Sequence, residues 1–113
     1  LRFTSAEHPV VDITDLGATA LLAEVPVERL RQDADVAALA ELGATPSGRL
    51  DVAALEAFCV SGSLRKAAEA LHLHHSSVAT RLARAEDVLG WSLDTPPGRF
   101  RAMVALLAHR LAG

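Results

Sequence analysis

The stretch of residues 63–87 carries its apolar residues at the spacing of two short helices that cross closely and are joined by a tight turn. Its pattern, A-A-x-x-L-x-L-x-x-x-x-V-x-x-x-L, has anchors at Ala67, Ala68, Leu71, Leu73, Val78 and Leu82. Two short helices approach closely only where side chains are small, and the two alanines meet that need. The pattern therefore predicts a helix-turn-helix whose second helix covers about residues 75–89.

The composition favours helices packed on helices. Alanine and leucine dominate the chain, and its only aromatic residues are Phe3, Phe58, Trp91 and Phe100. Close-packed helices use such residues, whereas strands are rich in β-branched and aromatic ones. We therefore expect an all-α, multi-helix domain that contains the helix-turn-helix.

Two features of the sequence bear on its compartment. No apolar run approaches the roughly 20 residues that span a bilayer, and no signal peptide is visible, so no membrane partner is expected. A single cysteine, Cys59, excludes an intramolecular disulfide and suits a reducing cytoplasm. Because Cys59 lies in an apolar helical stretch, we expect a buried structural thiol rather than a nucleophile.

Charge divides the chain into two parts. The net charge is −3, yet residues 1–49 hold four basic and eight acidic side chains, and residues 50–113 hold seven basic and six acidic ones. The acidic half is expected to be a different module from the basic half. Since the chain begins at Leu1 rather than a methionine, we expect a fragment of a longer protein.

The first half is expected to be helical from about residue 14 onward. Residues 10–13 favour a short strand or an extended lead-in, and Thr14 or Asp15 is a candidate cap for the first helix. Pro26 suits the first turn of a second helix that runs to Leu42, with an interruption at residues 33–35. The turn-rich residues 44–49 predict a linker.

The second half is expected to contain four helices. The first covers roughly residues 51–60, with inward-facing Leu50, Leu55, Phe58 and Cys59. Ser63 is the expected cap of the next helix, and Gly62 and Gly90 suit the left-handed residue after a helix. Thr95-Pro96-Pro97 predicts the start of the last helix. This helix is expected to run through the apolar residues Phe100, Met103, Val104, Leu107 and Leu111.

The second helix of the motif leaves polar side chains available to DNA. Residues near the start of such a helix normally reach base edges, whereas residues farther along it and on the first helix meet phosphates. The candidate base contacts are His75, Ser76, Ser77, Thr80 and Arg81. The candidate phosphate contacts are Arg65, Lys66 and Arg84, and Arg81 suits either role.

Further residues around the motif lie at a spacing that one protein family shares. They are Leu71-His72-Leu73-His74, Val78, Arg81-Leu82, Arg84, Glu86, Leu89-Gly90, Leu93-Asp94 and Arg99. With them, residues 50–113 resemble the C-terminal helix-turn-helix domain of the PucR/CdaR family of bacterial transcriptional regulators, whose usual run is L-H-V-H-R-N-T-V-x-Y-R-L-x-R-I-E-x-L-T-G. The resemblance implies sequence-specific binding of double-stranded DNA. It also implies that residues 1–49 are the end of an upstream regulatory region and its linker, with a short helical segment, and that an effector is sensed by domains outside this chain.

The departures from the family run fall where specificity is expected. The family's Arg-Asn-Thr is His75-Ser76-Ser77 here, and its tyrosine is Thr80. The missing arginine and asparagine are the groups best suited to bidentate contacts. This chain is therefore expected either to recognise a different site or to bind DNA with low affinity.

A metal site and an enzyme are both disfavoured. Imidazoles ligate transition metals, but His72, His74 and His75 have no cysteine or further histidine at a ligand spacing nearby. A structural or DNA-facing role fits them better, and their protonation below about pH 6.5 would mildly strengthen DNA binding. No nucleophile–base arrangement, phosphate-binding loop or catalytic carboxylate pair is visible, so neither catalysis nor a cofactor is expected.

Two hypotheses for function follow. The first is a DNA-binding domain that acts as a dimer, because two half-sites multiply the modest affinity of a weakly basic monomer. The second is a helical protein-interaction or dimerisation module with weakened or lost DNA recognition. It is motivated by the acidic pI of about 5.9 and by the missing Arg-Asn pair.

Overall fold

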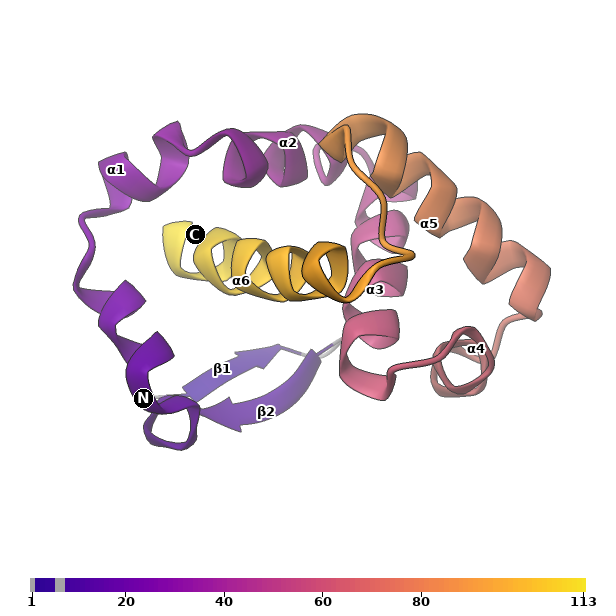
Figure 1. The fold of residues 1–113 in the computed structure, drawn as a ribbon, viewed down its shortest axis with the longest axis horizontal. Coiled ribbons are helices and arrows are strands. Elements are labelled where there is room, and N and C mark those ends of the chain that lie inside the picture. The colour runs from indigo at the N-terminus through magenta and orange to yellow at the C-terminus, as the bar shows by residue number, and fades with distance from the viewer. Residues whose placement is uncertain (1, 6–7) are drawn as a thin grey trace.

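The chain downstream of residue 26 folds into six α-helices, and the first three of them pack against the last, C-terminal one (Figure 1). The computed structural model describes residues 2–5 and 8–113, and the side chains of residue 17 and of residues 20–113. The helices are α1 (Val27–Gln32), α2 (Ala34–Leu42), α3 (Pro46–Ser61), α4 (Leu64–Leu71), α5 (His75–Leu89) and α6 (Pro96–Ala112). From residue 27 onward the expectation of an all-α, multi-helix domain with a helix-turn-helix is confirmed, whereas the start of the chain contains two strands that the all-α expectation did not include.

A short β-hairpin and a 3₁₀ segment precede the helices. Strand β1 (Arg2–Ser5) pairs with β2 (His8–Asp12) in antiparallel fashion, and Phe3 lies opposite Val11. The 3₁₀ segment η1 (Ile13–Glu24) is interrupted at Gly17, whose φ of 60° suits glycine. Residues 10–13 were expected to form a short strand or an extended lead-in, and the structure has a strand that ends at Asp12. The candidate caps Thr14 and Asp15 lie outside the described side chains.

The break between α1 and α2 occurs where it was expected. Asp33 ends α1 and begins α2, and its Oδ2 accepts hydrogen bonds from the backbone N–H groups of Asp35 (3.0 Å) and Val36 (3.1 Å). A carboxylate in this position satisfies two of the four backbone donors that a helix start leaves unpaired. Gly43 ends α2, as its position in the sequence predicts.

Helix α3 begins earlier than the sequence suggested. Thr45 is its N-cap, with Oγ1 2.9 Å from the amide nitrogen of Gly48, and Pro46 occupies the first turn. The prediction of a linker over residues 44–49 and of a helix start near Asp51 was therefore wrong. Gly48 lies inside this helix, at a point where the preceding chain comes so close that a residue without a side chain is needed. A Cβ at this position would lie only 1.6 Å from the carbonyl oxygen of Leu42.

Helix α6 buries a face made mostly of small residues. Its buried residues are Gly98, Ala102, Ala105, Leu106, Ala108 and Ala112. Because α1, α2 and α3 all contact α6, small side chains are needed on the face that meets them. The large apolar residues Phe100 and Met103 lie on another side of this helix and are 66% and 50% exposed. On α3, Leu50 is likewise 54% exposed rather than inward, whereas Leu55 is fully buried.

The core joins α2 to the helix-turn-helix. Its members are Leu39, Leu42, Val52, Ala54, Leu55, Ala67, Ala68, Val78, Leu82, Ala85, Leu89, Leu93, Ala102, Ala105 and Leu106. A second cluster, formed by Leu30, Val36, Ala108 and Ala112, lies between α1, α2 and the end of α6. Arg31 also donates two hydrogen bonds to the carbonyl oxygen of Ala112, at 3.1 and 2.9 Å. The helices before residue 43 are thus packed on the same framework as those after it.

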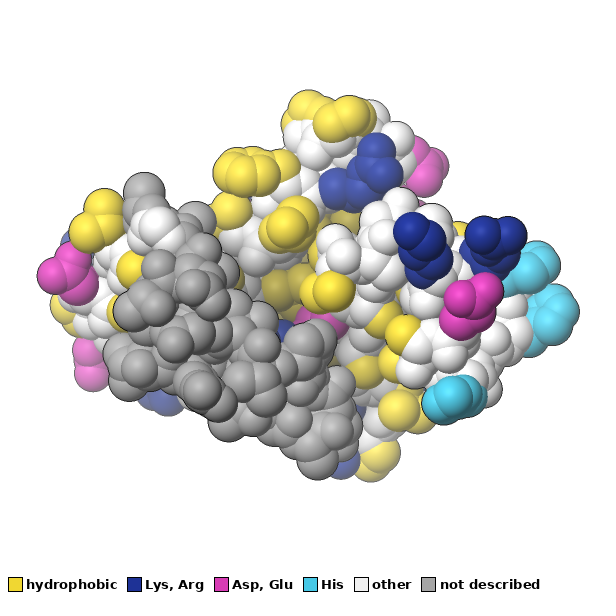
Figure 2. Space-filling view, turned by 90° about the horizontal axis from the view of Figure 1, so that it is seen from below, with side chains coloured by type: hydrophobic (Ala, Val, Ile, Leu, Met, Phe, Trp, Pro, Cys, Tyr) yellow, Lys and Arg dark blue, Asp and Glu magenta, His cyan; other side chains and the backbone are white. Residues whose placement is uncertain are grey.

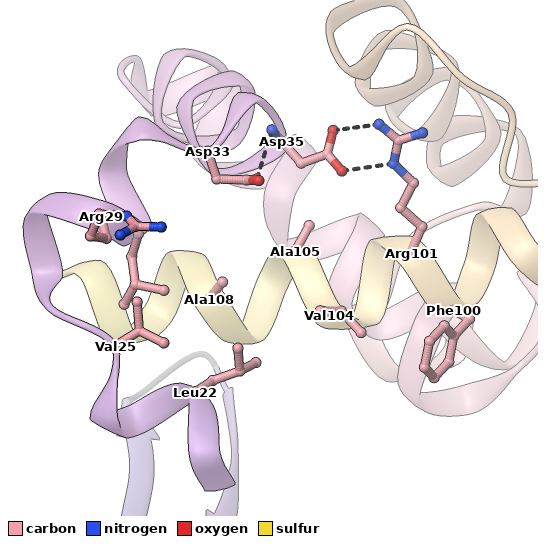
Figure 3. A pocket seen from close by; sticks show the side chains of 11 residues that line it. Leu22, Val25, Arg29, Asp33, Asp35, Phe100, Arg101, Val104, Ala105 and Ala108 are labelled. Carbon is pink, nitrogen blue, oxygen red and sulfur yellow. Dashed lines mark hydrogen bonds and ion pairs between the residues drawn. The ribbon is translucent and has the colours of Figure 1, made fainter. Parts of the chain in front are cut away.

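A polar cluster ties α2 to α6 and to the loop before it. Arg101 donates two hydrogen bonds to the carboxylate of Asp35, at 2.7 and 3.0 Å, and Trp91 Nε1 donates a third at 3.2 Å. The guanidinium carbon of Arg101 lies 4.6 Å from the centroid of the Trp91 ring. Figure 3 shows the Asp35–Arg101 pair at one end of a groove of about 500 Å³, which Leu22, Val25, Val104 and Phe100 also line.

Candidate nucleic-acid interface

Helices α4 and α5 form the helix-turn-helix, and local signals fix both ends of α4. Ser63 Oγ accepts a hydrogen bond from the backbone N–H of Lys66 at 3.1 Å, which confirms the predicted cap. At the other end, His72 adopts the left-handed conformation (φ 56°, ψ 42°). The N–H of Leu73 then donates to the carbonyl of Ala68 at 3.0 Å. This is the hydrogen-bond pattern of a Schellman turn, with histidine where glycine is usual.

An imidazole caps the N-terminus of α5. The backbone N–H of Ser76 donates to Nδ1 of His74 at 3.2 Å, and the Ser76 hydroxyl lies 2.8 Å from the same nitrogen. The His74 ring also stacks on that of His75, with their centroids 4.6 Å apart. For Nδ1 to accept from a backbone amide, the proton of the neutral ring must be on Nε2. The first turn of α5 is therefore held by a histidine side chain.

The buried face of α5 matches the predicted scaffold. Val78 and Ala85 are fully buried and Leu82 and Leu89 are nearly so, while Ala67 is fully buried on α4. Leu73 is the exception among the predicted anchors, because it is 41% exposed after the turn. The left-handed residue before it directs the chain outward at this point.

Four of the predicted base-contacting residues line the exposed start of α5. These residues, His75, Ser76, Ser77 and Thr80, are all exposed. The Thr80 hydroxyl donates to the carbonyl of Ser76 at 3.0 Å, so its oxygen lone pairs remain oriented toward solvent as acceptors. Residues 76 and 80 are one helical turn apart and thus share a row on the helix surface.

The predicted phosphate-contacting residues lie on both helices of the motif. Arg65 and Lys66 are exposed in the first turn of α4, and the side chain of Arg84 on α5 is 54% exposed. Figure 2 shows histidine and basic side chains gathered over the α4–α5 end of the molecule, with an acidic side chain among them. Glu69 is the acidic residue of α4 and is exposed. The surface is therefore only weakly positive before any histidine is protonated.

Arg81 has a partner inside the protein. Its Nη1 donates to Oδ1 of Asp51 on α3 at 2.9 Å, and its side chain is only 21% exposed. Arg84 Nη1 lies 3.6 Å from the same carboxylate oxygen. The sequence contains both partners but gives no sign that they meet, because 30 residues separate Asp51 from Arg81.

The acidic residues at the end of α5 lie beyond this surface. Glu86 Oε2 accepts a hydrogen bond from the backbone N–H of Leu93 at 2.7 Å, which turns its carboxylate toward the α5–α6 loop. Asp87 is exposed, three turns along the helix from Ser76. Of the two carboxylates, Glu86 is thus occupied by an internal contact.

Three observations on the described part of the chain bear on sites other than a nucleic-acid interface. No group of three or more His, Cys, Asp or Glu side chains able to hold a metal ion occurs among the described residues. Burial, with a smaller effect of the nearby Glu56 charge, raises the pKa of the Cys59 thiol to about 11, so it is a poor nucleophile. No helix among the described residues is long and apolar enough to cross a membrane.

The fold and this surface define a helix-turn-helix protein. A family model of the PucR C-terminal helix-turn-helix domain matches residues 52–108, about half of the chain. The chain therefore belongs to this family of DNA-binding transcriptional regulators. No curated protein and no solved structure matches it.

Proposed function

We propose that this chain binds double-stranded DNA in a sequence-specific manner, with the start of α5 in the major groove. The observation that carries the proposal is the row of exposed polar side chains on the first turns of α5, opposite a fully packed apolar face. Helix-turn-helix proteins present a recognition helix in this way, with its first turns exposed to DNA and a short helix packed behind it.

The contacts divide by position on the motif. His75, Ser76, Ser77 and Thr80 face base edges, where hydroxyls and imidazoles exchange hydrogen bonds with either purines or pyrimidines. Arg65, Lys66 and Arg84 meet the phosphates on either side of the groove, which fixes register rather than sequence. With no arginine or asparagine among the base-facing residues, discrimination by one monomer is modest.

A dimer is part of the proposal. The three candidate phosphate contacts give one domain weak affinity for phosphates, and two half-sites bound together would raise it through effective concentration. Residues 1–49 would belong to the end of an upstream regulatory region, with effector binding in domains outside this chain and the whole acting on DNA in the bacterial cytoplasm. Sedimentation of the chain with and without duplex tests the dimer.

A protein-interaction module is the second candidate, and one observation favours it. Phe100 and Met103 on α6 and Val60 at the end of α3 are large apolar residues that are at least half exposed. Phe100 and Met103 are three residues apart on α6 and so are neighbours on its surface, and adjoining exposed apolar side chains mark contact surfaces. If the chain forms a stable dimer yet has no affinity for any duplex, this candidate is the correct one.

Selection from random-sequence duplexes tests the main proposal directly. The immobilised 113-residue chain is used to enrich duplexes from a pool, and the affinities for an enriched and a scrambled duplex are measured by fluorescence anisotropy. We expect tighter binding of the enriched duplex and a linear fall in the logarithm of affinity with the logarithm of salt concentration. A folded chain that binds neither duplex at low salt rules the proposal out.

A further inference from the structure

A buried carboxylate in α3 depends on the recognition helix for its neutralisation. Asp51 is 3% exposed, and burial of an unpaired carboxylate is strongly unfavourable. The two cationic groups within 4 Å of it in the described structure are Arg81 at 2.9 Å and Arg84 at 3.6 Å. Both arginines are on α5, so the folded state of α3 requires α5 in one particular rotation.

The guanidinium of Arg81 is held at more than one point. Besides its contact with Asp51, Nη1 lies 3.4 Å from the carbonyl oxygen of Ser47, in the first turn of α3. Arg81 follows the buried Val78 by three residues and precedes the buried Leu82, so it lies at the edge of the apolar face. If Arg81 reached for a base edge, Asp51 would be left buried with only the longer, 3.6 Å contact to Arg84.

We propose that Asp51 and Arg81 are positioning residues that set the rotation of α5 about its own axis, and hence which side chains face the DNA. This inference rests on the proposed DNA binding, and it replaces the prediction that Arg81 contacts bases. The pair fixes the apolar edge of α5 against α3, so that residues 76, 77 and 80 face outward. Arg84, which shares the same carboxylate but is half exposed, remains free to meet a phosphate.

The positioning role and a direct DNA contact predict opposite results for a double variant. Arg81→Gln alone leaves the Asp51 carboxylate without its main partner, whereas Asp51→Asn/Arg81→Gln replaces the ion pair with two neutral amides that can hydrogen-bond to each other. If Arg81 only positions α5, the second substitution restores binding. If Arg81 contacts DNA, removal of Asp51 cannot restore it.

The experiment measures affinity for two duplexes at a temperature where every variant is folded, as judged by circular dichroism. One duplex is that enriched by the parent chain from a random pool, and the other is its scrambled counterpart. For Arg81→Gln we expect a loss of about tenfold for the enriched duplex, about 1.4 kcal/mol, with little change for the scrambled one and an unchanged salt dependence. The double variant should regain most of the lost affinity.

Arg84→Gln is the matched control, because it removes a cation of the same helix that is exposed. It should weaken both duplexes alike and reduce the salt slope by about one phosphate contact. Equal binding by Arg81→Gln and the parent, or a double variant no better than Arg81→Gln, overturns the positioning role. A folded parent that binds no duplex instead overturns the proposed function, and this inference with it.

Discussion

At the scale of single residues, the start of α5 depends on an unusual capping group. His74 satisfies the N–H of Ser76 through its imidazole Nδ1, a role that serine, threonine, aspartate or asparagine fills in most helices. The same residue belongs to the exposed histidine cluster that faces the proposed DNA site. One side chain thus caps the start of α5 and lies on the proposed binding surface.

Replacement of His74 tests its role as the cap of α5. His74→Ala removes the acceptor and should lower the free energy of unfolding by about 1 kcal/mol, the usual effect of a lost N-cap. His74→Ser supplies a hydroxyl acceptor at the same place and should restore that stability. Urea unfolding of the three proteins checks this. Equal stability of the alanine and serine variants would show that the imidazole is not the cap.

Arg84 is the residue of α5 for which a phosphate contact is the main expectation. Arg84→Ala should weaken binding to all duplexes by a similar factor and reduce the magnitude of the salt slope by about one. Arg29→Ala, which removes an exposed arginine from α1, is the control and should leave both quantities unchanged. Anisotropy titrations over a range of salt concentrations measure them. A change confined to one duplex would assign Arg84 to base recognition instead.

At the scale of the elements, two helices start in the same way. Helices α3 and α6 each start with the sequence Thr-Pro-x-Gly. The threonine is the N-cap, and its Oγ1 accepts a hydrogen bond from the glycine N–H. In both, the glycine lets the preceding chain approach the helix: a Cβ on Gly98 would lie 2.0 Å from the carbonyl oxygen of Ser92. The glycines therefore serve packing and not flexibility.

Substitution of Gly98 tests this close approach. Gly98→Ala requires the backbone at Ser92 to move, so we expect a loss of about 1–3 kcal/mol in the free energy of unfolding, although alanine is the better helix former. Pro97→Ala alters the neighbouring exposed position and should change stability far less. Thermal unfolding gives the comparison. A Gly98→Ala variant as stable as the parent would contradict the packing that the structure describes.

The turn between α4 and α5 contains a residue in a conformation that favours glycine. His72 is the one non-glycine residue with positive φ in the described part of the chain. The left-handed conformation is costly for a residue with a Cβ. His72→Gly should therefore raise the free energy of unfolding by about 0.5–1 kcal/mol. His72→Ala keeps the strain and should give no such gain, and chemical denaturation of both variants measures the difference.

At the scale of the whole molecule, a few long-range contacts join the two halves. The cluster of Asp35, Trp91 and Arg101 links α2 to α6 and to the α5–α6 loop. The hydrogen bonds from Arg101 have the largest effect on the pKa of Asp35 and lower it. The Trp91 hydrogen bond and the Arg101 charge add to this, against the opposing effect of burial. Because Asp35 is partly buried, its lowered pKa should make the stability of the folded chain depend on pH.

The sign of the pH dependence follows from that shift. Asp35 has a lower pKa when folded than its unfolded value of 3.8, so its contribution to stability is present above that pH. It is lost as the pH falls below 3.8 toward the folded value, because protonation then favours the unfolded chain. Arg101→Gln should be less stable than the parent at neutral pH and should lose less stability on acidification. Denaturation midpoints at several pH values measure both effects, and parallel curves would contradict the linkage.

The sequence by itself determined most of the helix boundaries and the motif. Ser63, Gly62, Gly90 and Thr95 mark helix ends where the structure has them, because a cap depends on hydrogen bonds between residues two to four positions apart. The scaffold of the helix-turn-helix was predictable for a similar reason. Small and large apolar residues at fixed spacing leave two short helices few ways to pack.

Only the tertiary structure decided which faces meet and which charges pair. The two apolar faces of α6 compete, and the alanine face is buried because three helices must approach it closely. Local rules make Gly48 a helix breaker, but glycine is required there because a Cβ would collide with a carbonyl oxygen of the preceding helix. The ion-pair partner of Arg81 is Asp51, 30 residues away. These three features depend on how the helices cross, and the crossing is set by the packing of the whole core and not by neighbours along the chain.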